Sequence, residues 1–280
     1  MLLHEPVVAR GWHARLELDY VRRDEATVLA SRRHSGPLLV QKPLHPEGAA
    51  VCQSILVHPP GGIAAGDALE LNCRVGTDAH VQITTPGAGK WYRSEGSESA
   101  QRVRFEVAAR AVCEWLPQET ILFDGARATM ETEIDIAPGG RFLGWEVLCF
   151  GRTAAGERFR SGHLRMRSRV VAGGRLAWLE RGTIAGGAPL LDAAPGLGGH
   201  PVSGLLLAAG TEADADLIAA MRRVQPRAGV CGVTRLPGLV VARYLGPAAE
   251  AARDYFTRLW YLLRPAFTGR EAVAPRIWST

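Results

Sequence analysis

The sequence predicts a mainly β protein, with a large layered body of about 14 to 17 strands and two short α-helices in the C-terminal third. Apolar residues recur at every second position, in short runs, from Arg15 to about Ala209. Glycine, proline, aspartate or asparagine breaks these runs, and no helical pattern separates them, which excludes a βαβ enzyme fold. Helical spacing of apolar residues begins only after residue 210.

Apolar runs mark the strands of the body in order along the chain. They cover residues 16–20, 26–30, 37–41, 51–57, 69–75, 81–85, 103–107, 111–123, 130–136, 141–150, 157–171 and 175–184. A sheet this large must fold over or wind into layers to bury its apolar face. We find no internal repeat and no linker, so we expect one domain over 1–280, with the β body at 14–209, a helix-containing part at 210–266 and a tail at 267–280.

A first helix is expected after residue 210. Thr211 is its expected cap, because Asp214 stands three positions later and acids fill the first turn. An apolar stripe follows at helical spacing, and Pro226 ends it.

A second helix is expected after two further strands at 229–236 and 238–244. Pro247 opens this helix and Pro265 ends it, and its simplest role is to pack on the sheet. The tail after Phe267 shows no periodicity, which predicts either a mobile end or a segment that orders on a partner.

The composition is that of a globular protein, with 280 residues of which 47% are hydrophobic and 22% charged. No apolar run reaches the roughly 18 residues of a membrane span and the N-terminus lacks an export signal, so we expect a cytoplasmic protein without membrane contact. Five widely spaced cysteines without a C-x-x-C pair suggest reduced, buried side chains rather than metal ligands. The net charge of +5 favours acidic partner surfaces, but nucleic acid is not expected because the basic residues are scattered.

The stretch 81–94, V-Q-I-T-T-P-G-A-G-K-W-Y-R-S, has the pattern of a half-buried strand that a Pro-Gly turn stops. This stretch is not a phosphate-binding P-loop, which needs glycine at Thr84 and Ser or Thr at Trp91. The turn presents four consecutive residues suited to a contact surface, Lys90, Trp91, Tyr92 and Arg93.

Several acids lie in apolar or glycine-rich surroundings. Glycines in H-P-P-G-G-I-A-A-G-D let the loop turn tightly and fix Asp67 inside the fold, although Asp67 could also serve only as an acceptor for turn amides. Glu146 interrupts a long apolar run and needs a partner, either Arg152 or a cation. Glu180 is in a similar position, next to Arg181.

The stretch 113–126 offers further oxygen donors around a kink at Pro117, among them Glu119 and Asp124, with an acidic strand edge in water as the alternative. Hydrolase, zinc-protease and nucleotide-binding motifs do not occur in the sequence. Carboxylates spread over several strands suit a divalent cation such as Ni²⁺ that is held loosely. We therefore expect no tightly bound cofactor.

Four of these segments, in this order and spacing, resemble the family of the urease accessory protein UreD, called UreH in some organisms. The resemblance runs from about Ala14 through Arg181, with a looser tail, and its departures at Ala64-Ala65 and Cys113 remove no polar group. The segments are P-P-G-G-I-A-A-G-D, T-T-P-G-A-G-K-W-Y-R-S, E-W-L-P-Q-E-T-I-L-F-D-G-A and G-W-E-V-L-C-F-G-R-T-A-A-G-E.

The resemblance implies a winding, β-helix-like body of many strands with two helices, and no enzymatic activity. Members of the family act with UreF and the GTPase UreG on the urease apoprotein and help nickel reach its active site. The resemblance further implies that Ni²⁺ in transit passes through an internal tunnel and that the nickel chaperone UreE loads UreG.

Carried onto matching positions, the resemblance makes Asp67, Glu146 and Glu180 the candidate tunnel-lining donors for nickel. The helices and tail after Thr211 are candidates for a surface that faces UreF. Candidates for the tunnel wall or a partner contact are Lys90, Trp91, Tyr92, Arg93, Glu119 and Asp124.

Two other function classes stay open. A β-helical carbohydrate-acting enzyme would use paired acids such as Glu119 and Asp124, and its sequence would show a repeating coil period, which we do not find. A plain β-sandwich binding module would have no water-filled passage through its body.

Overall fold

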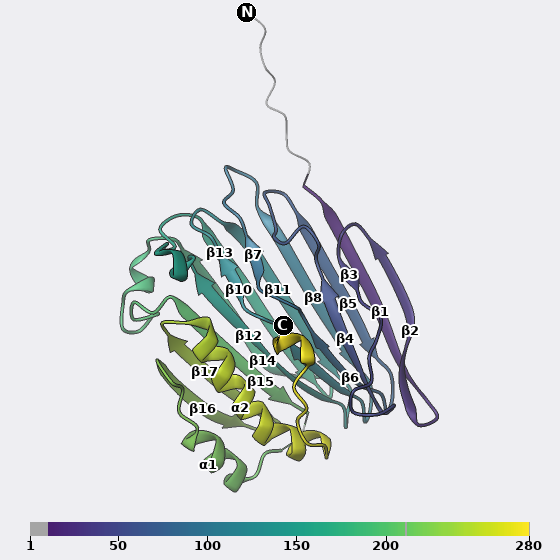
Figure 1. Ribbon diagram of the computed structural model, residues 1–280. Coiled ribbons are helices and arrows are strands. Elements are labelled where there is room, and N and C mark those ends of the chain that lie inside the picture. Colours follow the sequence, from purple (N-terminus) through teal and green to yellow (C-terminus); the bar gives the residue numbers. More distant parts are fainter. Residues whose placement is uncertain (1–10, 211, 280) are drawn as a thin grey trace, which may run out of the picture.

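The computed structural model describes residues 11–210 and 212–279. Figure 1 shows two large sheets lying face to face, with the helices against the outside of one of them. We call the sheet without helices the outer sheet and the sheet between it and the helices the middle sheet. Because the described residues form seventeen strands and two α-helices, both in the C-terminal third, the predicted mainly β fold is confirmed.

The outer sheet has seven strands and the middle sheet has ten. The outer sheet runs in the spatial order β14 (Arg175–Ala185), β13 (His163–Ala172), β11 (Arg127–Ile136), β8 (Ser99–Val107), β5 (Ala68–Val75), β1 (His13–Arg23) and β2 (Ala26–Ser35). The middle sheet runs β16 (Val230–Leu236), β17 (Leu239–Gly246), β15 (Val202–Ala209), β12 (Arg141–Phe150), β9 (Val112–Leu116), β6 (His80–Thr84), β4 (Val51–Val57) and β3 (Leu39–Val40). Two short strands complete it, because β10 (Thr120–Leu122) pairs with β12 and with β7 (Gly89–Trp91).

The central strands wind as the stacked coils of a solenoid. From β5 to β12 the chain alternates between the sheets, and each coil pairs in parallel with the next. The third residue of each of the three corner turns has a left-handed backbone, with φ of 60° at Asp78, 57° at Arg110 and 78° at Gly139. The backbone conformation repeats here while the residue type does not, which is why we find no repeat in the sequence.

Two separate cores explain the different patterns of the two sheets. One core fills the space between the sheets, and the second lies between the middle sheet and α2 (Ala249–Thr268). All five residues of β6 are buried, because both faces of the middle sheet are covered. The outer sheet alternates instead, since its far face carries charged side chains in water, as where Arg74 pairs with Asp19 at 3.4 Å and Glu106 at 3.2 Å.

The helix boundaries differ from the prediction. The first helix, α1 (Ala215–Arg223), is capped by Asp214, whose carboxylate accepts a hydrogen bond from the Leu217 N–H at 2.7 Å. Thr211, the predicted cap, lies outside the described residues. The second helix, α2, continues through Pro265 and ends at Gly269, because its last turn buries Phe267 in the second core. None of the described helices is both long and apolar enough to cross a membrane.

The described part of the C-terminal tail packs on its own chain, which differs from the predicted mobile end, and order on a partner stays a prediction. The Trp278 indole donates a hydrogen bond to the Thr84 hydroxyl at 2.8 Å. The same ring lies 5.8 Å from the ring of Trp145 and 5.9 Å from that of Trp260. Figure 1 shows this end of the chain beside α2, over the middle sheet.

Candidate functional site

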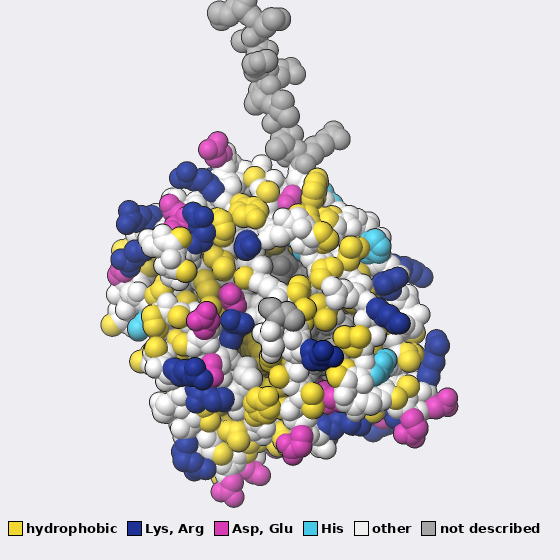
Figure 2. Space-filling model, viewed as in Figure 1, with side chains coloured by type: hydrophobic (Ala, Val, Ile, Leu, Met, Phe, Trp, Pro, Cys, Tyr) yellow, Lys and Arg dark blue, Asp and Glu magenta, His cyan; other side chains and the backbone are white. Residues whose placement is uncertain are grey.

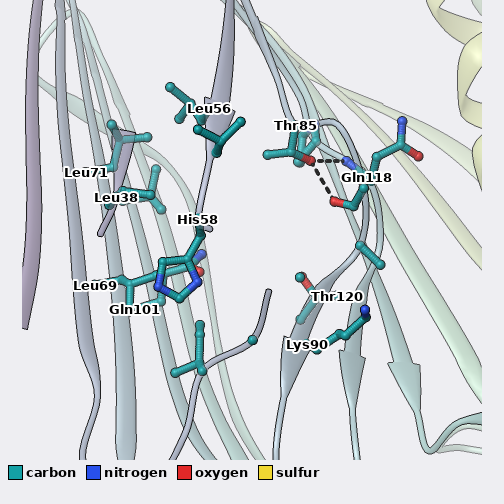
Figure 3. Close-up of a pocket in the computed structure, with 18 of the residues that line it drawn as sticks. Leu38, Leu56, His58, Leu69, Leu71, Thr85, Lys90, Gln101, Gln118 and Thr120 are labelled. Atoms are coloured by element: carbon teal, nitrogen blue, oxygen red, sulfur yellow. Dashed lines mark hydrogen bonds between the residues drawn. The ribbon is translucent and has the colours of Figure 1, made fainter. Parts of the chain in front are cut away.

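A cavity of about 330 Å³ lies between the two sheets, at the strand ends remote from the corner turns. Its walls come from the first halves of outer strands β5, β8 and β11, from β12, and from the loops at 58–63 and 85–90. One side is apolar and the other largely polar, with the His58 ring projecting between them (Figure 3). Burial lowers the pKa of His58, and the charge of Asp67 partly opposes this.

Glu146 supplies the carboxylate of this cavity. The preceding residue on β12, Trp145, packs against Phe256 of α2, so alternation along the strand directs Glu146 to the space between the sheets. Within the described residues its side chain makes no hydrogen bond and no ion pair. Arg152, predicted as its partner, pairs with Glu157 instead, at 2.6 Å.

The charge state of Glu146 is finely balanced. Burial, and secondarily the negative charge of Glu180, raises the pKa of Glu146 to about 7. At neutral pH the carboxyl group therefore exchanges between its protonated and charged forms. A divalent cation would displace that proton and relieve the repulsion between the two acids.

Glu180 lies on the edge strand β14 and is bound on one side only. Its Oε1 accepts a hydrogen bond from the Arg243 guanidinium of β17 at 2.9 Å, so Arg243 rather than the neighbouring Arg181 is its partner. Its Oε2 is buried and has no hydrogen-bond partner. Glu180 therefore joins β14 of the outer sheet to β17 of the middle sheet, and its Oε2 is left without a hydrogen bond.

Asp67 lies outside the cavity and caps a turn. Its two carboxylate oxygens accept hydrogen bonds from the backbone N–H of Trp12 at 2.7 Å and of Ala64 at 2.8 Å. This geometry matches the alternative in which Asp67 serves turn amides. Its role as a nickel donor stays a prediction, and we do not include it in the candidate site.

The motif Lys90–Arg93 is divided among four environments. Lys90 lines the cavity, and Trp91 is buried in the core between the sheets. Tyr92 is partly exposed and packs edge-on against Phe123 with 5.2 Å between ring centroids. Arg93 lines a different, open cleft on the surface. The four residues therefore do not form one contact surface.

Glu119 and Asp124 are each engaged with a different part of the chain. Glu119 forms an ion pair with Arg253 of α2 at 3.0 Å. Asp124 accepts hydrogen bonds from the backbone N–H groups of Arg160 and Ser161, both at 2.8 Å. They do not form the free carboxylate pair that a carbohydrate-acting enzyme would need.

A buried charge network on the other face of the middle sheet was missed by the sequence analysis. The Glu114 carboxylate accepts hydrogen bonds from Arg264 at 3.0 Å and from Trp260 at 2.7 Å. It also forms a hydrogen bond with the His80 ring at 2.7 Å. Arg264 also pairs with Glu47 at 2.8 Å. Burial alone would raise the pKa of Glu114, but the hydrogen bond and charge of His80 and the charge of Arg264 lower it overall.

Residues 11–210 and 212–279 contain no group of three or more His, Cys, Asp or Glu side chains that could hold a metal ion. The five cysteines are free and four of them are buried, as predicted. Glu146 lines the cavity, whereas Glu180 does not, although its negative charge is near enough to raise the pKa of Glu146.

Comparison with known proteins gives one consistent family. The family model described as UreD urease accessory protein matches residues 13–279. Curated proteins named urease accessory protein UreD are similar over nearly their full length: that of Azoarcus sp. (strain BH72) is 54% identical over 96% of this chain and 95% of the relative. The protein from Dechloromonas aromatica is 51% identical over 99% of this chain and 98% of the relative. The chain therefore belongs to the UreD family of urease accessory proteins.

Proposed function

We propose that this chain acts in urease maturation as a non-catalytic scaffold that passes nickel ions to the urease apoprotein. The observation that carries the proposal is the Glu146 carboxylate, which faces the cavity between the sheets without a partner among the described residues. The relatives of this chain are named accessory proteins rather than enzymes, which supports a non-catalytic role.

The chemistry of the cavity suits an ion that must leave again. Among the described residues that line the cavity, Glu146 alone supplies a carboxylate, and much of the remaining wall is apolar side chains such as Leu69, Leu71 and Met130, which hold no competing donor. An ion held this weakly can be released, the same compromise that channel filters make. Lys90 on the polar side adds a positive charge that opposes strong retention of a cation.

The partners that we propose are those expected of a urease accessory protein. In this proposal UreF binds the chain, the GTPase UreG releases nickel when it hydrolyses GTP, and UreE supplies UreG. Figure 2 shows basic and acidic side chains mixed with apolar ones over the face that carries the helices. That mixture suits protein partners, and nucleic acid is not among the partners we propose.

The variant Glu146→Gln tests the passage. It removes the charge and keeps the shape, so the chain should fold and assemble with UreF, UreG and the urease apoprotein as the wild type does. Nickel content and activity of co-expressed urease should fall several-fold, because the cavity then lacks its unpaired charged donor. The measurement is nickel per urease subunit by elemental analysis.

The matched control is Glu133→Gln, which removes a carboxylate from the far face of the outer sheet, where Glu133 pairs with Arg167 at 3.2 Å. The control should load urease normally. Wild-type nickel content with Glu146→Gln in an assembled complex would rule out this cavity as the route.

A further inference from the structure

A second concave site lies on the surface, apart from the nickel cavity. It is an open cleft of about 490 Å³ whose lining includes Arg93, Arg127 and His163. We call it the Arg93–Arg127 cleft. The proposed passage of nickel uses none of its residues.

Backbone hydrogen bonds join three chain segments into a fixed rim for this cleft. The Ser94 N–H donates to the Gly125 carbonyl at 3.0 Å, and the Gly125 N–H donates to the Ser161 carbonyl at 3.1 Å. Arg127 and His163 stand opposite each other in the register of the parallel strands β11 and β13. The basic side chains are therefore attached to paired backbone rather than to a long loop.

Gly125 leaves the room that Arg93 occupies. Its φ is +83°, and a Cβ there would lie 2.9 Å from the Cγ and Nε atoms of Arg93. A side chain at this position would displace the Arg93 guanidinium. The glycine thus supports the placement of Arg93 in the cleft.

The two arginines have unused hydrogen-bond donors, although the charge of Arg93 also acts on the nearby Asp124 carboxylate, whose pKa is lowered mainly by hydrogen bonds from Arg160 and Ser161. Within the described residues, neither the Arg93 nor the Arg127 guanidinium makes a hydrogen bond or an ion pair. Glu98 is held by His163 at 2.6 Å and by Arg165. Asp124 uses its Oδ1 for the Ser161 hydroxyl at 3.0 Å and for two backbone N–H groups. Of the acids around the cleft, this leaves Glu95 without an ion pair.

We propose that the Arg93–Arg127 cleft docks an acidic segment of a partner protein, whose carboxylates the two guanidiniums bind. Guanidinium groups match carboxylates with two parallel hydrogen bonds. The cleft is larger and more open than one small anion needs, which suits the side chains of an extended segment. The inference rests on the proposed function only in taking the partner from the urease maturation complex.

The position of the cleft adds a functional reason. Arg93 lies three residues after Lys90, which lines the nickel cavity, so a single short segment connects the two sites. A partner docked on Arg93 would be held beside the passage.

Binding of a fluorescent hexaglutamate peptide to the full chain, followed by anisotropy, tests the proposal. The variant R93E/R127E should bind this peptide about tenfold more weakly or worse, because two attractive charges become repulsive. The matched control is R32E/R33E, which makes the same charge change at two exposed arginines on β2 that have no ion pair among the described residues. The control should bind like the wild type. Pull-down of UreF, UreG and urease subunits with the same variants should show the same difference.

Equal binding of hexaglutamate by R93E/R127E and the control would overturn the proposal. The proposal would also be overturned if R93E/R127E no longer bound a single-stranded DNA oligomer but still bound hexaglutamate, because the cleft would then bind nucleic acid. If R93E/R127E does not fold, as judged by thermal unfolding, R93Q and R127Q carry the same comparison. Glu146→Gln should bind hexaglutamate normally, so wild-type nickel delivery by this variant counts against the proposed function and leaves the docking site standing.

Discussion

Among the described residues, Glu146 is a carboxyl group that lines a cavity without an ion pair. A carboxylate in a long apolar strand is costly to charge unless something compensates it. Here the compensation is not a salt bridge, because Arg152 is bound to Glu157 and Glu146 faces the cavity. As a result, burial and the negative charge of Glu180 raise the pKa of Glu146 to about 7.

This raised pKa predicts a pH-dependent stability. The folded chain holds the Glu146 proton more tightly than the unfolded chain, so the contribution is complete below the ordinary pKa of 4.5 and is lost as pH rises through about 7. The full loss corresponds to roughly 3 kcal/mol. The free energy of unfolding of Glu146→Gln should therefore rise relative to that of the wild type as the pH increases from 5 to 8. Denaturant unfolding at both pH values measures this change.

The exposed acid Glu133 provides the comparison for that experiment. Glu133→Gln should change the pH dependence of the free energy of unfolding by far less, because this side chain is partly in water beside Arg167. If Glu146→Gln follows the wild type at both pH values, Glu146 is ordinarily charged and the account of its burial is wrong.

Among the elements, α2 shows how tertiary packing overrides a local stop signal. Pro265 cannot donate the hydrogen bond of its turn, and its sequence predicted the end of the helix there. The helix continues because Phe267, which follows the proline, is buried in the second core. Its end is set instead by Gly269, with φ of 70°.

Gly269→Ala should destabilise the chain by about 1 kcal/mol, because alanine adopts this left-handed conformation poorly. No atom lies within 4 Å of the added Cβ, so the cost comes from the backbone alone. Gly182→Ala is the control: its Cβ also meets no atom within 4 Å, and its φ is not positive, so it should be close to neutral. Equal midpoints for the two variants in urea would contradict this assignment.

Across the molecule, the Glu114–Arg264 pair connects α2 to the middle sheet. Both side chains are fully buried, and Glu47 and His80 complete the network. Because the pKa of Glu114 is lowered on folding, its stabilisation is present above its ordinary pKa and is lost as pH falls through the folded value. The network thus joins the coils to the C-terminal part.

Glu114→Gln should cost about 3 kcal/mol or more, because it removes the charge that compensates a buried guanidinium. Breaking the exposed Arg102–Glu131 pair on the outer sheet with Glu131→Gln should cost less than about 1 kcal/mol. Free energies of unfolding for the two variants check this contrast. Similar small losses would mean that Glu114 is not a structural link.

The candidate site could be predicted in part. Glu146 was identifiable because one acid interrupts an apolar run, a pattern visible within a single strand. Its surroundings were not, since Glu180 and its partner Arg243 are 63 positions apart. The buried network of Glu114 could not be predicted, because alternation in one strand does not show that helix α2 covers the face on which Glu114 lies. Its partner Arg264 is also 150 positions away.

The spacing of apolar residues by itself determined that this chain forms many strands, where they alternate, and two late helices, where they recur at helical spacing, because side-chain period is a local property of the backbone. Only the tertiary structure decided how the strands stack into coils, which sheet is covered twice, and where the helices end. It also decided which acids face a cavity and which accept hydrogen bonds from backbone amides or pair with arginines. Those outcomes depend on contacts between residues far apart in sequence, and no local pattern records them.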